Sequence, residues 1–346
     1  MEKKKKIMLS LLGIVAVLIA IFSVVLLNAN SVDEPSNNDN NNEEQEVEKE
    51  PEPTLQILDL DNKQRPIAVM IDNNVRARPH SGLQDAFVVY EVIVEGGQTR
   101  LMALFHDKDT SIVGPVRSTR HYFIDYVLEH DAIFAHFGGS PQAYTDLGRL
   151  NVANIDGMVV SGTYYRDSSR RAPHNAYTTM ENLKTRIGNS NFRVNMSNDH
   201  VLNYSIEQID LQNIEGVQES LTPTFRYSSS HTSSYVYDPE NKVYIRSMNG
   251  NGHNDRETGD TYTFKNIIGI YVDNFGLDGT GRQDLRTVTS GEGFFITEGY
   301  AVPINFEKSA RSSQTNFTLK DGTPLEINDG NTFIQVFPKG RTISLN

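Results

Sequence analysis

An uncharged apolar run at residues 7–27 directly follows four lysines near the N-terminus. About 20 apolar residues are enough for a helix to cross the hydrocarbon core of a membrane, and a lysine cluster before such a helix stays in the cytoplasm. The pattern predicts a basic cytoplasmic tip at residues 1–6 and a transmembrane signal anchor at residues 7–27. We therefore expect a single-pass protein of the cytoplasmic membrane whose remaining chain is extracellular.

A cleaved signal peptide is the alternative interpretation of this segment. The apolar core of a signal peptide has about 7–15 residues. The run here is longer, and Leu27-Asn28-Ala29 fits a small-x-small cleavage site poorly. The chain also has no cysteine, so it cannot carry a cysteine-linked lipid or a disulfide framework. These observations favour the uncleaved anchor.

Residues 28–54 consist mainly of Asn, Glu and Pro. Such a composition buries too little apolar surface to offset the entropy lost on ordering, so we expect a disordered acidic linker. The linker carries nine acidic residues and one lysine, which is a large share of the net charge of −12. The rest of the chain is therefore only mildly acidic. Because nucleic-acid-binding domains carry basic surfaces, we expect no nucleic-acid partner.

Residues 55–205 alternate strand-like and helix-like patterns. Apolar runs of strand length lie at residues 67–71, 87–94, 101–106 and 132–137. Helices are predicted at residues 119–129, after Ser140-Pro141 as cap and first residue, and after Thr178 with Glu181 as a capping box. This alternation predicts an α/β (α+β) N-terminal domain.

After a join at residues 206–221, the pattern at residues 222–346 changes. Strand-like runs at residues 235–237 and 243–245 flank a turn, others lie at residues 267–272, 293–297 and 332–337, and residues 273–284 fit a hairpin loop. No helical periodicity stands out in this part of the sequence. We therefore predict a smaller, mostly β C-terminal domain.

Two arginines mark the first candidate site. Arg117 and Arg120 stand where residues 114–120 lead into the helix predicted at residues 119–129, with Ser118 or Thr119 as its cap. Free N–H groups and the dipole at a helix start favour an anion, and the arginine fork suits phosphate or carboxylate. The alternative is that both arginines simply pair with acids such as Glu91 or Asp125.

The hairpin predicted at residues 87–106 supplies further candidates. If the strand continues, Glu91 and Glu95 share one face of it, and Arg100 stands across the turn. Two carboxylates on one face could bind a cation or serve as acid and base. A Glu95–Arg100 pair, with Glu91 bound by another arginine, is the alternative that we favour.

Polar residues at predicted strand and helix ends complete the set. Asp72 ends the first strand, where α/β sheets collect ligands, or else it caps a turn. Ser140 begins a helix after two glycines. Two further loops can reach the same edge, with His174 serving as a base or a structural hydrogen-bonding group. Their candidates are Arg78, His174 and Asn175. No metal-ligand spacing or catalytic motif is legible, and no cofactor is indicated.

Several motifs together resemble the YerB family, also known as the DUF3048 domain pair. They are residues 67–72, Ala77-Arg78-Pro79, Tyr90-Glu91, residues 94–97, 99–103 and 113–118, Gly138-Gly139-Ser140-Pro141 and Pro173-His174-Asn175. The resemblance implies an exported protein of a Gram-positive bacterium, with an α/β N-terminal domain and a smaller β-rich C-terminal domain. Many members are lipoproteins, whereas this chain lacks the cysteine that would be lipidated. The resemblance assigns no catalytic residue.

Two functions stay open from the sequence. The first is a cell-envelope binding protein whose arginine-rich edge holds an anionic glycan, a lipid-linked precursor or an acidic envelope protein. The second is an enzyme acting on phosphorylated or acidic envelope polymers, in which arginines clamp the anion and a carboxylate acts as base or metal ligand. A concave pocket with a carboxylate facing the arginines would favour the enzyme.

Overall fold

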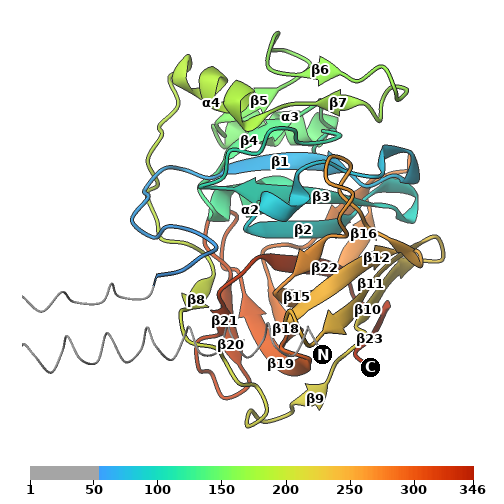
Figure 1. Cartoon of the computed structure of the whole chain (residues 1–346). Helices are drawn as coiled ribbons and strands as arrows, with labels where there is room; N and C mark the ends of the chain where they lie inside the picture. The colour runs from blue at the N-terminus through green and yellow to red at the C-terminus, as the bar shows by residue number, and fades with distance from the viewer. Residues whose placement is uncertain (1–53) are drawn as a thin grey trace, which may run out of the picture. The chain divides into compact units, whose positions relative to one another are not determined.

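The computed structural model describes residues 54–346. Their main feature is a sheet of eleven strands that contains strands from both halves of the chain (Figure 1). From one edge to the other it contains β20 (Asn316–Leu319), β19 (Tyr300–Glu307), β18 (Ser290–Thr297), β15 (Asn266–Val272), β22 (Thr332–Pro338), β2 (Val88–Ile93), β3 (Thr99–Phe105), β1 (Ile67–Asp72), β4 (Ile133–His136) and β5 (Asn154–Asp156), with β9 (Gln218–Glu219) pairing β19.

The predicted hairpin of the first half is confirmed. β2 and β3 pair antiparallel with Tyr90 opposite Met102, and every residue of both strands is buried. Continuous apolar runs are typical of strands covered on both faces. The turn at Glu95–Gly97 is a single 3₁₀ turn, in which Gly96 takes a left-handed φ of 68° that glycine adopts without steric cost.

β22 joins the two halves. It pairs in parallel with β15 on one side and with β2 on the other, so the sheet continues across the expected boundary at residues 206–221. Contacts within Pro53–Asn346 group these residues into one compact unit. The expected domains at residues 55–205 and 222–346 therefore share one hydrophobic core.

A second sheet packs on β22. It contains β13 (Asn251–Gly252), β12 (Val243–Met248), β11 (His231–Asp238), β10 (Thr224–Ser228) and β23 (Thr342–Ser344), with β14 (Thr263–Phe264) pairing β12. The predicted hairpin at residues 235–245 is confirmed as β11–β12. The aromatic rings of Phe264 and Phe333 lie 4.8 Å apart, as do those of Tyr227 and Phe337. Edge-to-face aromatic packing therefore joins the two sheets.

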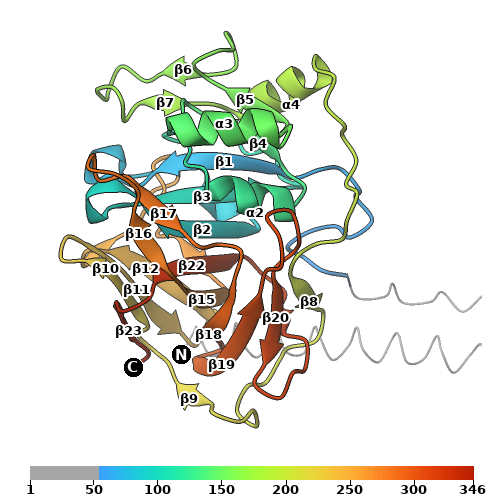
Figure 2. The same cartoon turned by 180° about the vertical axis from the view of Figure 1, so that it is seen from behind.

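Three short helices accompany the strands of the first half (Figure 2). They are α2 (Phe123–Glu129), α3 (Pro141–Arg149) and α4 (Met180–Gly188). The predicted cap of α3 is confirmed, because the Ser140 side chain accepts a hydrogen bond from the Ala143 N–H. The cap predicted for α4 is wrong by one residue. Thr179 caps that helix, while the Thr178 hydroxyl donates to the Thr163 carbonyl.

Three two-stranded sheets complete the fold, namely β16 (Asn274–Gly276) with β17 (Gln283–Leu285), β21 (Glu326–Asn328) with β8 (Asn203–Ser205), and β6 (Tyr165–Arg166) with β7 (Ala176–Tyr177). The first pair confirms the hairpin predicted at residues 273–284. Strands dominate both halves, so the described fold is mostly β.

The predictions for the N-terminal segment fall outside the described residues. They concern the cytoplasmic tip at residues 1–6, the anchor at residues 7–27 and all but the last residue of the linker at residues 28–54. Among residues 54–346, no helix has the length and apolar character needed to cross a membrane.

Candidate functional site

A cleft of about 630 Å³ lies where the end of β1 meets the β2–β3 turn. Its walls come from the first half of the chain, the start of α3 and the β16–β17 hairpin. Seven of the ten residues selected from the sequence line it, namely Asp72, Glu95, Arg100, Arg117, Arg120, Ser140 and His174. Most of the residues selected from the sequence therefore meet at one concave surface, although the sequence gave no distances between them.

Asp72 is a central acidic group of the cleft. One of its carboxylate oxygens lies 2.7 Å from His174 Nδ1 and 3.3 Å from Arg117 Nε. The other oxygen accepts a hydrogen bond of 3.1 Å from the Asn74 N–H, so Asp72 also caps the turn after β1. The turn-capping role considered for this aspartate is therefore confirmed, and Asp72 also lines the cleft.

Glu95 differs from its predicted place. β2 ends at Ile93, and Glu95 lies in the following turn, so the prediction that Glu91 and Glu95 share one strand face is wrong. Arg120 holds the Glu95 carboxylate at 2.5 and 2.9 Å, and Arg100 lies 4.0 Å away. Burial alone would raise the pKa of Glu95, but the hydrogen bond and charge of Arg120, with the charge of Arg100, lower it.

Arg100 is a nearly buried cation at the inner end of the cleft. Its guanidinium donates to the Ser118 carbonyl. Burial, followed by the charges of Arg120 and Arg117, lowers the pKa of Arg100 to about 10. Three arginines therefore crowd one wall, and their mutual repulsion exceeds what nearby Glu95 and Asp72 offset.

The helix start predicted beside Arg117 and Arg120 is wrong. α2 begins only at Phe123 and has no side-chain cap, and the Ser118 hydroxyl donates instead to the Phe137 carbonyl. The Arg117 N–H donates to Met70, which fixes this segment along the end of β1. The arginines therefore lie in a segment before α2 that belongs to no helix or strand. Their expected acid partners also differ, since Arg117 pairs with Asp72 and Arg120 with Glu95.

The segment that leads into α3 forms another wall. The Gly138 N–H donates to Asp156 at 2.8 Å, and Gly139 and Ser140 line the cleft. The Ser140 oxygen is engaged by its own helix, as its capping contact shows. Ser140 therefore acts as the N-cap of α3.

Arg282 is a lining residue that the sequence did not reveal. It lies on the β16–β17 hairpin, donates to Gln142 of α3 at 3.2 Å and pairs with Asp278 at 3.1 Å. Its segment was expected to be a hairpin loop and was not linked to the first half of the chain. Only the tertiary fold brings a residue 140 positions beyond Gln142 to this wall.

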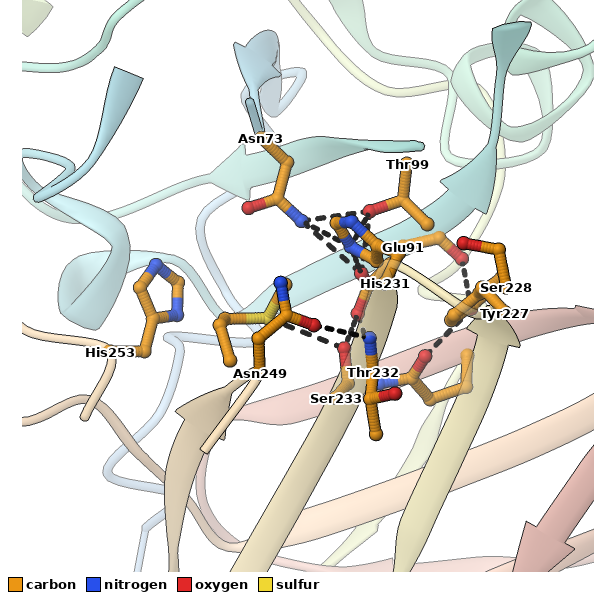
Figure 3. Close-up of polar contacts among 12 residues, drawn as sticks. Asn73, Glu91, Thr99, Tyr227, Ser228, His231, Thr232, Ser233, Asn249 and His253 are labelled. Carbon is orange, nitrogen blue, oxygen red and sulfur yellow. Dashed lines mark hydrogen bonds and ion pairs between the residues drawn. The ribbon is translucent and has the colours of Figure 1, made fainter. Parts of the chain in front are cut away.

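Glu91, another selected residue, lies in a buried polar cluster behind the cleft. Figure 3 shows its side chain converging with those of Thr99, His231 and Ser233. The Thr99 and Ser233 hydroxyls each donate a hydrogen bond of 2.6 Å to the Glu91 carboxylate. Arg246 pairs with it at 2.8 Å and His231 lies 3.0 Å away. Burial opposes ionisation, but Arg246 and His231 outweigh it and lower the pKa of Glu91 well below its usual range. The expected pairing of Glu91 with an arginine is confirmed, through Arg246.

A chain of hydrogen bonds links this cluster back to β1. Arg246 donates to His253 Nδ1, His253 Nε2 lies 2.6 Å from His80 Nδ1, and His80 Nε2 lies 2.7 Å from the Asp72 carbonyl. Each histidine then accepts on one nitrogen and donates from the other, as a neutral imidazole does. Burial and the nearby arginines lower the pKa of both histidines, which agrees with this arrangement.

Thr99 belongs to both the cleft and the buried cluster. It lines the cleft, yet its hydroxyl lies 2.6 Å from Glu91 and 2.6 Å from His231 Nε2. The Asn73 amide donates to the same hydroxyl at 2.8 Å. The inner end of the cleft is therefore braced by an ordered polar network.

Two selected residues support neighbouring loops. Arg78 donates to the Asn73 carbonyl at 3.1 Å, and burial with the charge of Arg246 lowers its pKa to about 10. Asn175 accepts from Arg166 at 2.8 Å and donates to the Asp167 and Arg170 carbonyls. Neither residue lines the cleft. Within residues 54–346, no three His, Cys, Asp or Glu side chains gather closely enough to hold a metal ion.

Comparison with known proteins gives one consistent result. Residues 55–193 match the family model described as "Protein of unknown function (DUF3048) N-terminal domain", and residues 223–334 match its C-terminal counterpart. The chain is 29% identical over 283 residues to "Putative lipoprotein YerB" of Bacillus subtilis (strain 168), covering 80% of this chain and 82% of that protein. The crystal structure of YerB from Bacillus subtilis is similar with a TM-score of 0.71 and 28% identity, covering 81% of this chain and 94% of that one.

Proposed function

The chain belongs to the YerB-like family with paired DUF3048 domains, and on this premise we propose that it is a membrane-anchored, extracytoplasmic protein of the cell envelope that binds an anionic ligand in the cleft. A phosphate-bearing or acidic envelope glycan is the ligand class that we favour. The name of the Bacillus subtilis relative, a lipoprotein, is consistent with a place at the envelope.

The observation that carries the proposal is the excess of positive charge in the cleft. Four arginines line it against two carboxylates, and those carboxylates are already held by Arg117 and Arg120. Burial, followed by the charges of Arg120 and Arg117, lowers the pKa of Arg100, so this cation lies among like charges with little water around it. An anion in the cleft would relieve that repulsion, and guanidinium groups can bind its oxygens in pairs.

Titration of the full chain with inorganic pyrophosphate by isothermal calorimetry tests this function. Loss of a hydrogen bond to a charged group costs about 1.5–3 kcal/mol, so Arg117→Ala and Arg120→Ala should each weaken binding roughly tenfold to a hundredfold. Arg149→Ala is the matched control, because Arg149 lies at the far end of α3 and pairs with Asp146 at the surface. Equal weakening by all three variants, or no binding at all, would contradict the proposal.

An enzyme of acidic envelope polymers is a second candidate, favoured by one contact. The 2.7 Å bond between Asp72 and His174 orients an imidazole on the cleft wall, as a carboxylate does for a general base. If the cleft is catalytic, the full chain should cleave poly(glycerol phosphate), with new phosphate monoesters visible by ³¹P NMR. His174→Gln should then abolish cleavage and leave pyrophosphate binding within about threefold. Intact polymer after prolonged incubation with the wild-type chain would remove this candidate.

A further inference from the structure

Resting on the anion-binding function above, we propose that the ligand of the cleft is an anionic amphiphile, namely a phosphate ester whose apolar chain leaves the cleft across a border of exposed apolar side chains. The arginines of the cleft would hold the head group. Three separate segments that border the cleft each carry exposed apolar residues, and their positions support the path of the chain.

The first border is the turn after β5. Met158 and Val159 in this turn are 66% and 79% exposed. Asp156 ties the turn to the cleft wall, because one of its oxygens accepts from both the Gly138 N–H and the Met158 N–H, at 2.8 and 2.9 Å. Met158 Cγ lies 3.5 Å from the position that a Cβ on Gly138 would take. Met158 therefore lies directly beside the glycine turn that precedes α3.

Tyr144 of α3 extends the same border. Its hydroxyl donates to the other oxygen of Asp156 at 2.8 Å, which fixes the ring in place. The ring lies 3.5 Å from the position of a Cβ on Gly139, a lining residue of the cleft, and yet remains exposed on its other side. A held aromatic ring at a cleft edge offers apolar area at a low cost in conformational entropy.

The second border is the turn after β1. Val75 is 70% exposed and directly follows Asn74, which lines the cleft and donates to Gln98 at 2.9 Å. Val159, Val75 and Met158 are the three most exposed large apolar side chains among residues 54–346. All three belong to turns that adjoin lining residues of the cleft, whereas apolar residues exposed singly are scattered over a surface.

The third border is the β16–β17 hairpin, whose Arg282 donates to Gln142 of α3 at 3.2 Å. The Leu277 N–H donates to the Arg282 carbonyl, so these residues face each other across the hairpin. Phe275 stands opposite Asp284, whose carboxylate contacts His121. Side chains of paired residues lie on one face of a hairpin. The exposed side chains of Phe275 and Leu277 therefore share the face that carries Arg282 toward the cleft.

These borders distinguish an amphiphile from a wholly polar anion. A polar glycan or a free phosphate would gain nothing from five or six exposed apolar side chains around its binding site. An alkyl chain would gain about fourfold in affinity for each methylene that it fully buries. The arginines inside the cleft match the phosphate head group of such a ligand, and the apolar side chains at the borders match its alkyl chain.

The test is a chain-length series. The full chain is held in non-ionic detergent micelles and titrated by calorimetry with ethyl, butyl and hexyl phosphate. We expect affinity to rise at least tenfold from ethyl to hexyl phosphate. The double variant Met158→Ser/Val159→Ser should reduce that rise to less than threefold and leave ethyl phosphate binding unchanged. Because probe partition into micelles is the same for every variant, comparison of variants cancels it.

Val236→Ser is the matched control, because Val236 is exposed on β11 of the second sheet. It should keep the full rise with chain length. Ethyl phosphate binding that depends on Arg117 but does not strengthen with chain length would overturn the amphiphile and leave anion binding standing. No binding of any alkyl phosphate would remove both. A chain-length effect that persists in Arg117→Ala would show apolar association without the cleft, and it would also overturn the proposal.

Discussion

Arg246 and Glu91, which stand 155 positions apart in the chain, form an ion pair of 2.8 Å in which neither side chain has any exposed surface. Arg246 comes from β12 of the second sheet and Glu91 from β2 of the main sheet. The pair is enclosed by hydrogen bonds from Ser233, Thr99 and Gln335 to the same carboxylate. Two charges buried this deeply depend on each other.

Arg246→Met should therefore lower the free energy of unfolding by about 3–5 kcal/mol, because it leaves the Glu91 carboxylate buried without its counter-ion. Glu91→Gln should cost a similar amount for the reverse reason. Urea denaturation followed by circular dichroism measures both. Arg149→Ala, a change at the exposed end of α3, should stay within about 0.5 kcal/mol of the wild type. Losses below about 1 kcal/mol for both buried variants would show that the pair is dispensable.

Stability should fall in mild acid because of buried histidines. Burial lowers the pKa of both His80 and His130 to about 3, against an ordinary value of 6.5. Between these values the unfolded state binds more protons than the native state, so stability rises with pH and is lost as pH falls from about 6.5 toward 3. Glu91, whose native pKa is lowered from 4.5, adds to the loss only below about that pH.

The expected slope is up to about 1.4 kcal/mol per pH unit for each buried histidine. Unfolding free energies from urea titrations at pH 7.5, 6 and 5 measure it. His130→Gln should reduce the slope of unfolding free energy against pH by about the contribution of one buried histidine. This reduction is expected whether or not the variant also changes stability at pH 7.5. A slope that His130→Gln leaves unchanged would contradict the assignment of this histidine as a neutral, buried group.

Gly82 should not tolerate alanine. It takes a φ of 82°, and a Cβ there would lie 2.4 Å from the Ile112 carbonyl oxygen. The left-handed conformation alone costs a non-glycine residue about 1–2 kcal/mol, and the clash with fixed backbone adds about 1–3 kcal/mol. Gly340 has a φ of 80° with no atom within 4 Å of its Cβ position. Thermal unfolding should therefore show a clearly larger loss for Gly82→Ala than for Gly340→Ala, and equal losses would exclude the clash.

Removing one acid should strengthen anion binding in the cleft. Glu95 repels an incoming anion at short range, and its lowered pKa keeps it charged. At an effective dielectric constant near 20, a charge at about 8 Å contributes roughly 2 kcal/mol. Glu95→Gln should therefore tighten pyrophosphate binding by about tenfold in 50 mM salt. The gain should shrink in 500 mM salt because exposed charges are screened. Weaker binding by this variant would mean that Glu95 is needed chiefly to position Arg120.

Local sequence patterns predicted the central strands of the main sheet and part of the cleft. Continuous apolar runs identified β1, β2 and β22, and the Ser140-Pro141 pair identified the start of α3. The glycines after Glu95 indicate a turn between β2 and β3 but do not show where β2 ends. Glu95 was placed on the strand because alternation alone does not show where a strand stops and a 3₁₀ turn begins.

The partners of the buried charges could not be predicted in this way. Glu91 lies within the apolar run at residues 87–94, and the sequence indicates that some arginine binds it. Arg246 and His231 meet it only because the second sheet packs on the first, and Arg282 reaches the cleft only through a hairpin of the second half. Such contacts depend on tertiary packing between distant segments, for which a single sequence has no periodic pattern.

The position of β22 also means that the main sheet cannot be completed until β22 has been made. It lies between β2 and β15, yet it is made long after β2. Until it emerges, the buried edge of β2 has no partner, and an unpaired apolar strand edge invites pairing with other chains. The edge of β2 therefore stays unpaired while more than two hundred further residues are added to the chain. A newly made chain of this kind is therefore exposed to aggregation until β22 has been made.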